Sequence, residues 1–189
     1  MALISISTVL LAIHIVSQCL TVSSVSFELD GNNQVQLDGD AKFMCGNTAR
    51  RVLNGGSAGR VVYNTTIPLG NSNFTTHFQF QINWTRDNED NRSDIGGDGF
   101  AFFMASPVSG FHVPYRGDGR WLGLFNEQNN DKLSNYLVAV EFETYKTSWD
   151  SDDNHMGIDV NNIVSEVWVP LAQRLINSKT WDARIDDSG

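Results

Sequence analysis

The chain has 189 residues, of which 41% are hydrophobic and five are Trp, and this composition excludes an intrinsically disordered protein. Acidic residues outnumber basic ones by 22 to 13, giving a formal net charge of −9, which argues against nucleic acid or an anionic membrane as the main partner. The length suits a leader followed by one domain, because domains cluster at roughly 100–150 residues.

The N-terminal segment 1–24 contains no Asp, Glu, Lys or Arg, and residues 1–16 form an apolar run. This run is too short to cross a membrane, which takes about 20 apolar residues. It matches the hydrophobic region of a secretory signal, and the run from Thr21 to Ser24 supplies small residues for cleavage. We therefore expect a signal peptide at residues 1–24, a secreted product and no membrane span on this chain.

Four Asn-x-Ser/Thr sequences have the pattern of N-glycosylation acceptors. They begin at Asn64, Asn73, Asn83 and Asn91, and none has Pro in the middle position. In a secreted protein we expect some of them to carry glycans.

The remainder, residues 25–189, has the pattern of an all-β domain. Short runs rich in β-branched and aromatic residues are separated by clusters of Gly, Asn, Asp and Ser, as in strands joined by turns. In chain order, the expected strands are 60–63, 74–82, 99–105, 121–125, 137–145, 155–160 and 164–169. Residues 171–176 are the one helix-like stretch, and 87–98 are expected to form an exposed loop. Many short strands with little helix predict a β-sandwich or jelly roll.

One stretch of the chain carries most of the potential chemistry. Side chains two residues apart in a strand share a face, so Glu141, Glu143 and Tyr145 are expected to point the same way. Two neighbouring carboxylates repel each other unless protons or cations neutralise them. Asp150 and His155 follow in the next loop and strand, from which they can fold back over that face. Carboxylates suit calcium and an added imidazole suits manganese, so the pattern predicts two adjacent cations that share carboxylates.

Two other interpretations of these residues remain open. The acidic side chains can form a solvated face, with His155 as an ordinary surface histidine. Alternatively, paired carboxylates two residues apart on a sandwich strand can act as the nucleophile and acid of a retaining glycosidase. Jelly-roll hydrolases of that kind use a Glu-x-Asp-x-x-Glu strand, and Lys146 stands at the position of the third carboxylate. The absent acid/base group argues against an enzyme.

Several ordered motifs resemble the legume lectin (L-type lectin) family, which includes the extracellular domains of plant lectin receptor kinases. LVAVEFETYKTSWDSDDNHMGIDVNNIVS at 137–165 resembles the metal-binding strand and loop of the family. The other motifs are QLDGDA at 36–41, GRVVY at 59–63, FTTHF at 74–78, GDGFAFF at 97–103 and WLGLFN at 121–126. The resemblance spans about residues 26–187 and implies a concanavalin-like jelly-roll β-sandwich.

This resemblance implies a non-enzymatic carbohydrate-binding module whose partners are glycans or glycoproteins. In the family, an Asp that follows a cis peptide accepts hydrogen bonds from sugar hydroxyls, and Asp98 after Gly97 stands at that position. An aromatic residue on the metal strand stacks on the sugar, and Tyr145 stands there. A backbone N–H before the Leu-Gly-Leu-Phe motif also contacts sugar. Gly119 lies in that region, where Arg120 replaces the usual Gly.

The resemblance also implies adjacent calcium and manganese ions, which hold the sugar-binding loops in shape. The residues that resemble the manganese ligands are Glu141, Glu143, Asp150 and His155. Those that resemble the calcium ligands are Glu143, the Tyr145 carbonyl, Thr147 and Asp150.

Two of these positions depart from the family pattern. Glu143 replaces an Asp and is one methylene longer, so a carboxylate that bridges two cations must shift one of them or change its rotamer. Thr147 replaces an Asn that binds calcium and also donates its N–H to the sugar, and a hydroxyl cannot reach as far. Losing one such contact costs about ten- to a hundredfold in affinity. We therefore expect weaker calcium and sugar binding than in typical members, or an altered specificity.

The C-terminal sequence WDARIDDSG at 181–189 resembles a segment that is followed by several more strands in the family. The lectin domain at 25–189 is therefore expected to be C-terminally incomplete and to lack its last strands. A homodimer is compatible with the resemblance, because members of the family often dimerise through their sheets. Three functions stay open: a secreted lectin of the plant apoplast, a degenerate lectin-like defence protein that acts through protein contacts, and, with least support, a glycoside hydrolase.

Overall fold

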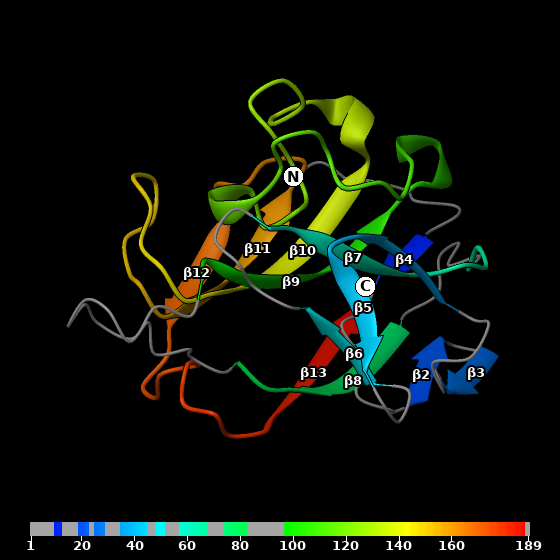
Figure 1. The fold of residues 1–189 in the computed structure, drawn as a ribbon, viewed down its shortest axis with the longest axis horizontal. Coiled ribbons are helices and arrows are strands. Elements are labelled where there is room, and N and C mark those ends of the chain that lie inside the picture. The colour runs from blue at the N-terminus through cyan, green and yellow to red at the C-terminus, as the bar shows by residue number, and fades with distance from the viewer. Residues whose placement is uncertain are drawn as a thin grey trace.

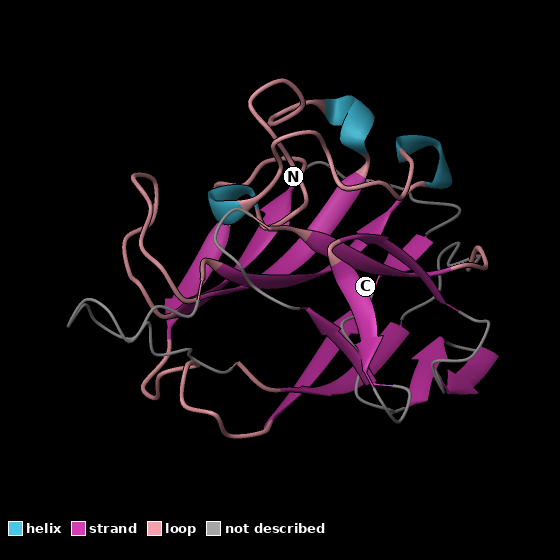
Figure 2. Cartoon of the chain, in the orientation of Figure 1, coloured by secondary structure: helices cyan, strands magenta, loops and turns pink. Residues whose placement is uncertain are grey.

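The computed structural model describes residues 10–12, 19–22, 25–28, 35–44, 48–51, 57–67, 74–82 and 97–187. Side chains are described in 35–42, 57–67, 74–82 and 97–187. Strands and loops dominate these residues, and the helical elements are three short 3-10 turns, η1 (Pro107–Ser109), η2 (Gly119–Trp121) and η3 (Leu133–Asn135). Figure 2 shows this distribution. The expected loop at 87–98 lies outside the described residues except for its last two positions.

The strands form a larger sheet, a smaller sheet and a hairpin. The larger sheet contains β1 (Leu10–Ala12), β4 (Val35–Gly39), β7 (Gly59–Tyr63), β9 (Gly99–Ala105), β10 (Leu137–Glu143), β11 (His155–Val160) and β12 (Val167–Pro170). The described strands are hydrogen-bonded in the order β12-β11-β10-β9-β1-β7-β4. The smaller sheet contains β2 (Cys19–Val22), β3 (Val25–Glu28), β8 (Phe74–Phe80) and β13 (Trp181–Asp187), in the order β13-β8-β2-β3. The hairpin pairs β5 (Ala41–Met44) with β6 (Thr48–Arg51).

The two sheets form two layers, and most of the long loops lie beyond the outer face of the larger sheet (Figure 1). All described pairings within the sheets are antiparallel, including β10 with β9 on one side and with β11 on the other. The register places Glu143 opposite His155 and Glu141 opposite Gly157. The predicted all-β sandwich is therefore confirmed.

Two apolar clusters lie on opposite faces of the larger sheet, because successive side chains of β10 alternate between them. The first fills the space between the sheets with aromatic rings. Phe78 of β8 packs against Phe102 of β9 with ring centroids 6.0 Å apart, and Phe100 stacks on Phe142 at 4.7 Å. The second cluster lies under the loops that follow β9, where Phe125 is completely buried. This second cluster fixes the loops that carry the candidate site.

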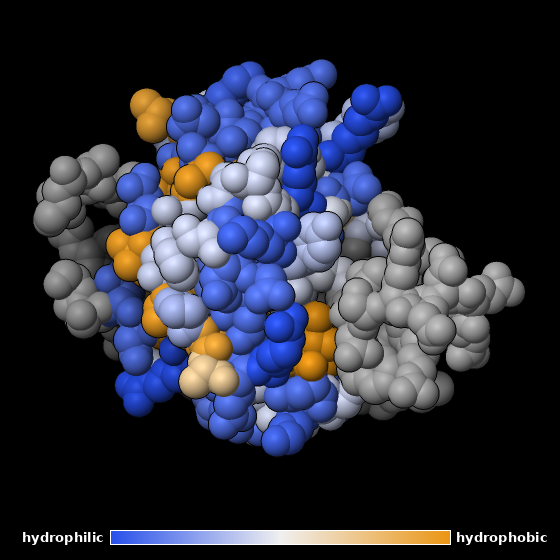
Figure 3. Space-filling model, turned by 90° about the vertical axis from the view of Figure 1, so that its left-hand side faces the viewer, coloured by the Kyte–Doolittle hydropathy of each residue, from blue (hydrophilic) through white to orange (hydrophobic). Residues whose placement is uncertain are grey.

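Strand β12 forms one edge of the larger sheet, and all four of its residues are exposed. Figure 3 shows the side of the molecule that lies at the left of Figure 1, where separate apolar patches interrupt a mostly hydrophilic surface. The exposed apolar side chains of β11 and β12 include Ile158, Val167, Trp168 and Val169. Pro170 at the end of β12 has no N–H and therefore limits the addition of another strand at this edge.

Two strands fall within residues 1–24, which are expected to form a signal peptide. Strand β1 pairs with β9 and β7, and β2 pairs with β8 and β3. Cleavage of the leader stays a prediction, and a molecule that has lost residues 1–24 would lack both strands. Within the described part of the chain, no helix is long and apolar enough to cross a membrane.

Two predicted elements are wrong. Residues 121–125 form turns instead of a strand, since Leu122 and Gly123 have φ of 51° and 74° and the Leu124 N–H donates to the Trp121 carbonyl at 2.8 Å. Residues 171–176 form bends instead of a helix. There the Asn154 side chain takes the backbone groups that a helix would pair, with Nδ2 donating to the Leu171 carbonyl and Oδ1 accepting from the Leu175 N–H.

Candidate functional site

The predicted acidic strand and its neighbour form a buried polar cluster at one end of the larger sheet. Glu141 and Glu143 of β10 are 1% and 3% exposed, and His155 at the start of β11 is 2% exposed. Since β10 and β11 are paired, the alternation of side chains directs these three groups to the same face. This register confirms that Glu141 and Glu143 share a face and that His155 lies over it. Tyr145, which the sequence pattern predicts to share that face, lies beyond the end of β10 and is exposed, so the strand alternation does not extend to it. The alternative of a solvated acidic face is wrong, because these side chains are buried.

Hydrogen bonds connect this cluster to the loop before β11 and to the turn after it. His155 Nε2 lies 3.1 Å from Glu141 Oε1, and His155 Nδ1 lies 3.0 Å from the Asp152 carbonyl oxygen. The Ser165 hydroxyl donates to Asp159 Oδ1 at 2.9 Å and also contacts Glu141 Oε1. With an acceptor at each ring nitrogen, His155 is placed to donate from both.

The packing of the cluster requires glycine at position 157, because a side chain there would collide with its neighbours. A Cβ at this position would lie 2.5 Å from Glu141 Oε1 and 2.0 Å from Ser165 Oγ. Strand β11 therefore allows Glu141 and Ser165 to approach its backbone closely.

The cluster holds more negative charge than its surroundings neutralise. Burial, followed by the charge of Glu141, raises the pKa of Glu143 to about 10 and that of Asp159 to about 9. Burial lowers the pKa of His155, but the hydrogen bond and charge of Glu141 outweigh it and the pKa is raised. Among the described residues, Glu143 Oε1 and Asp159 Oδ2 are buried without a hydrogen-bond partner. Buried oxygens of this kind are satisfied in proteins by a proton, a water molecule or a cation.

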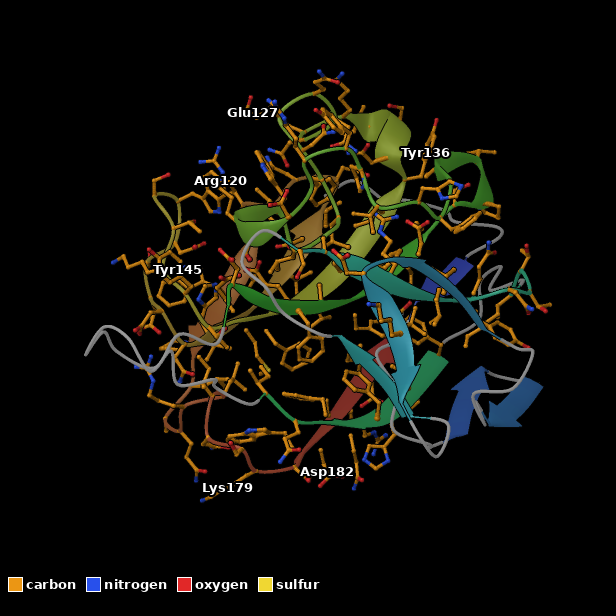
Figure 4. The ribbon with its side chains drawn as sticks, viewed as in Figure 1. Arg120, Glu127, Tyr136, Tyr145, Lys179 and Asp182 are labelled. Atoms are coloured by element: carbon orange, nitrogen blue, oxygen red, sulfur yellow. The ribbon has the colours of Figure 1, made fainter. Side chains whose placement is uncertain are left out.

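The loop after β10 holds the remaining predicted ligands. The Thr147 N–H donates to Asp150 Oδ2 at 2.8 Å, and the Thr147 hydroxyl also contacts that oxygen. Asp150 acts on the buried cluster through its charge, which contributes to the raised pKa of Glu143. Tyr145 follows the strand by two residues, and its side chain is 56% exposed. It projects from the same side of the molecule as Arg120 in Figure 4.

The structure brings Asp98 and Gly119 together, although 20 sequence positions separate them. The Asp98 carbonyl accepts the Thr144 N–H, and the Gly97 carbonyl accepts the Thr144 hydroxyl, each at 2.8 Å. A Cβ on Gly119 would lie 3.5 Å from Asp98 Oδ2, and Gly119 has a left-handed φ of 59°. The expected cis peptide between Gly97 and Asp98 is wrong, because none of the described peptide bonds is cis.

Two residues of the buried polar cluster, Asp159 and Ser165, were not among the site residues predicted from the sequence. Asp159 lies four residues beyond His155 on β11, so the same alternation that brings His155 inward could have indicated it. Ser165 lies in a turn, and the predicted strand at 164–169 concealed its role. Of the four glycosylation sequences, Asn64 lies exposed just after β7, while Asn73, Asn83 and Asn91 lie outside the described residues.

The types of donor atom suit a metal centre, but the described side chains do not converge on a common point. Carboxylates, a main-chain carbonyl and an imidazole are ligands for calcium and for manganese. Within the described part of the chain, however, no three His, Cys, Asp or Glu side chains converge closely enough to hold an ion. Within the polar cluster, His155 Nε2 and Glu141 Oε1 lie 3.1 Å apart.

A two-sheet β-sandwich with polar residues gathered on loops at one end of its larger sheet is a framework typical of binding modules. The legume lectin domain matches residues 21–187, and the chain belongs to this family. The domain that defines this family is a non-enzymatic carbohydrate-binding domain. The predicted family membership is thereby confirmed, as is the prediction that this domain is not an enzyme, and the family assignment argues against the glycoside hydrolase alternative.

Individual relatives agree with this assignment. The chain is 40% identical over 118 residues to the L-type lectin-domain containing receptor kinase V.9 of Arabidopsis thaliana, covering 58% of this chain and 16% of that protein. It is 35% identical over 167 residues to agglutinin-2 of Cladrastis kentukea, covering 77% of this chain and 54% of the agglutinin. The chain thus spans about half the length of the agglutinin and a small part of the kinase.

Solved structures show the same fold. A lectin from Bauhinia forficata in complex with GalNAc matches with a TM-score of 0.69 and 26% identity, covering 92% of this chain and 73% of that one. Lectin II from Ulex europaeus matches with a TM-score of 0.65 and 32% identity, covering 82% and 66%. The predicted jelly-roll sandwich of the legume lectins is confirmed by these neighbours.

Proposed function

We propose that this protein is a secreted, extracellular lectin module that binds glycans or glycoproteins through the loops around Asp98 and Gly119. The observation that carries this proposal is the position of Gly119 beside the Asp98 carboxylate, since a Cβ on Gly119 would lie 3.5 Å from Asp98 Oδ2. The backbone of Gly119 and the Asp98 carboxylate thereby face the same region. Sugar hydroxyls both donate and accept, so they can bind such a pair. Tyr145 supplies an exposed ring on the adjoining loop for an apolar sugar face.

We further propose that adjacent calcium and manganese ions shape this site. Glu141, Glu143, Asp150 and His155 would hold manganese, and Glu143, the Tyr145 carbonyl, Thr147 and Asp150 would hold calcium. The support is the set of donor types and the buried Glu143 Oε1, an oxygen that a cation would satisfy. The ions would neutralise the carboxylates and hold the loop at 144–154 in one conformation.

A glycan array tests the sugar proposal with the full chain and two isosteric variants. Asp98→Asn is expected to weaken binding by about tenfold or more, because an acceptor of sugar hydroxyls is lost. Asp131→Asn is the control, since it removes the same charge from an exposed position of another loop. Equal binding by both variants would contradict a role of Asp98.

Metal analysis and calorimetry test the ions on the same protein. Chelation is expected to lower both the midpoint of thermal unfolding and glycan binding. Calcium binding is expected to be weak, because Glu143 and Thr147 replace the usual ligands of the family. Two metal sites with the affinity that is ordinary in the family would contradict this expectation. Intact mass of the secreted protein tests removal of residues 1–24 and glycosylation, since a retained leader would keep β1 and β2.

One observation favours the second candidate, a degenerate lectin-like protein that acts in defence through protein contacts. The hydroxyl and N–H of Thr147 both contact Asp150, so neither is directed to a sugar. A folded protein that binds no glycan with or without added metal would support this candidate.

A further inference from the structure

Arg120 lies next to the candidate sugar-binding residue Gly119, and two tryptophan rings hold its side chain. The guanidinium carbon lies 5.1 Å from the ring centroid of Trp121 and 4.9 Å from that of Trp149. The two indole rings are themselves 5.4 Å apart. Trp121 is buried beneath the loop, and Trp149 comes from the loop that carries Asp150. Two separate segments of the chain therefore fix the position of one cation.

The N–H donors of Arg120 are only weakly engaged. The contacts with the two rings are cation–π contacts and use no N–H···O hydrogen bond, so the N–H groups of the guanidinium remain available as donors. Among the described residues, the one ion pair of Arg120 joins its Nη2 to Glu127 Oε1 at 3.4 Å. The side chains of Arg120 and Glu127 are 44% and 81% exposed. A long and exposed pair of this kind adds little stability and is readily exchanged for another anion.

The position of Arg120 relates it to the proposed sugar site. Gly119 lies beside Asp98, whose Oδ2 is 3.5 Å from the point where a Cβ on Gly119 would stand, and Arg120 is the next residue along the chain. Figure 4 shows Arg120 and Tyr145 on the same side of the molecule, with Glu127 further along the loop. A glycan held by Asp98 therefore has Arg120 within reach of a neighbouring sugar unit or substituent.

We propose that Arg120, backed by Trp121 and Trp149, is a subsite for the carboxylate of an acidic glycan of the uronic-acid type. This inference rests on the proposed function and names its substrate class. The planar guanidinium matches a carboxylate with two parallel N–H···O bonds, and the ligand would displace Glu127.

The charge of the whole protein strengthens the argument. With a formal net charge of −9, the chain repels anions in general. The carboxylate of Glu127, 3.4 Å from Arg120, adds negative charge beside the site itself. A preference for an acidic over a neutral glycan must therefore come from a specific cation, and Arg120 is the cation that lies next to Gly119 and packs against two tryptophan rings.

Methyl esters provide matched probes, because esterification removes the charge and leaves the sugar ring unchanged. Binding of the full chain to oligogalacturonate and oligoglucuronate is compared by calorimetry with binding to their methyl esters. We expect at least one acid to bind about tenfold or more tightly than its ester. The preference is expected to fall as salt is raised, because an exposed ion pair is screened.

Two substitutions assign the preference to Arg120. Arg120→Gln is expected to bring acid and ester to similar affinity, and Arg120→Lys to retain only part of the difference because Lys lacks the planar fork. Arg116→Gln is the matched control. Arg116 lies 5.4 Å from the ring centroid of Tyr115 on the same segment, so its loss removes an equal charge. Thermal unfolding of each variant verifies that the protein is folded.

Each outcome bears on a defined part of the proposal. Equal binding of every acid and its ester by the wild type, or an unchanged preference in folded Arg120→Gln, overturns the subsite. If the subsite is overturned but neutral glycans bind the wild type and bind Asp98→Asn more weakly, the proposed function still holds. Absence of binding to any glycan overturns both proposals.

Discussion

Asn154 links the start of β11 to the segment that follows β12, and its replacement by Leu is expected to be strongly destabilising. Its Nδ2 donates to the Leu171 and Gln173 carbonyls at 2.9 and 3.0 Å, and its Oδ1 accepts from the Leu175 N–H at 2.8 Å. The side chain is buried, and the next residue is His155 of the polar cluster. Leu has a similar size and can form none of these bonds.

The magnitude follows from the three bonds and the groups that lose them. Each buried hydrogen bond contributes about 0.5–1.5 kcal/mol net, and a buried group left unpaired costs about 1–3 kcal/mol more. Leu175 is buried while Gln173 is exposed to water, so only part of this second cost applies. We expect Asn154→Leu to lower the free energy of unfolding by about 3–4 kcal/mol, or the midpoint temperature by about 6–16 °C.

Urea unfolding followed by tryptophan fluorescence measures this loss. The matched control is Asn177→Leu. Asn177 makes similar backbone contacts in the same region, at the Arg174 carbonyl and the Lys179 N–H, but it is only half-buried and its hydrogen bonds are exposed to water. We expect the control to lose about 1 kcal/mol or less. An equal loss in the two variants would refute the reasoning, since burial would then have no effect on the value of these bonds.

Two further substitutions test other parts of the site and the fold. Gly119→Ala is expected to weaken glycan binding by about tenfold and to have a smaller effect on stability, because the added methyl group would face Asp98 and Gly119 has a left-handed φ. Binding at the wild-type level would contradict the placement of the sugar beside Gly119. Asp38→Asn is expected to cost about 1–2 kcal/mol at pH 7, measured by urea unfolding. Burial raises the pKa of Asp38, but the Val113 N–H and the His112 ring outweigh it and leave the pKa below its usual value. This stabilisation is present above the unfolded pKa of about 4 and is lost as the pH falls, so an equal cost at pH 7 and pH 3 would argue against it.

The buried polar cluster could be predicted in part because strands have a period of two residues. Glu141 and Glu143 share a face for that reason, and the same period places His155 opposite Glu143 once β10 and β11 pair. Ser165 could not be predicted in this way, because it reaches Glu141 from a turn. A turn has no period, and its path depends on contacts with residues distant in the sequence.

Residues 121–125, which were predicted as a strand, also depend on contacts with residues distant in the sequence. The apolar residues of this segment are typical of a strand, and burial of Phe125 and Leu124 satisfies that tendency without strand geometry. What decides the conformation is Arg60 of β7, which donates to the Gly123 and Leu124 carbonyls at 2.8 and 3.1 Å. A partner some 60 positions away along the chain replaces the ladder that a strand would need.

Different interactions therefore hold the two halves of the candidate site. Arg60 fixes the loop that carries Gly119, and although burial lowers its pKa to about 10, it stays charged at neutral pH. The loop from Tyr145 to Asp150 depends instead on the buried carboxylates that are proposed to bind cations. Chelation is therefore expected to loosen the half that carries Tyr145 and to leave the conformation around Gly119 in place. Loss of glycan binding on chelation would then arise from one loop, with the opposite wall of the site still formed.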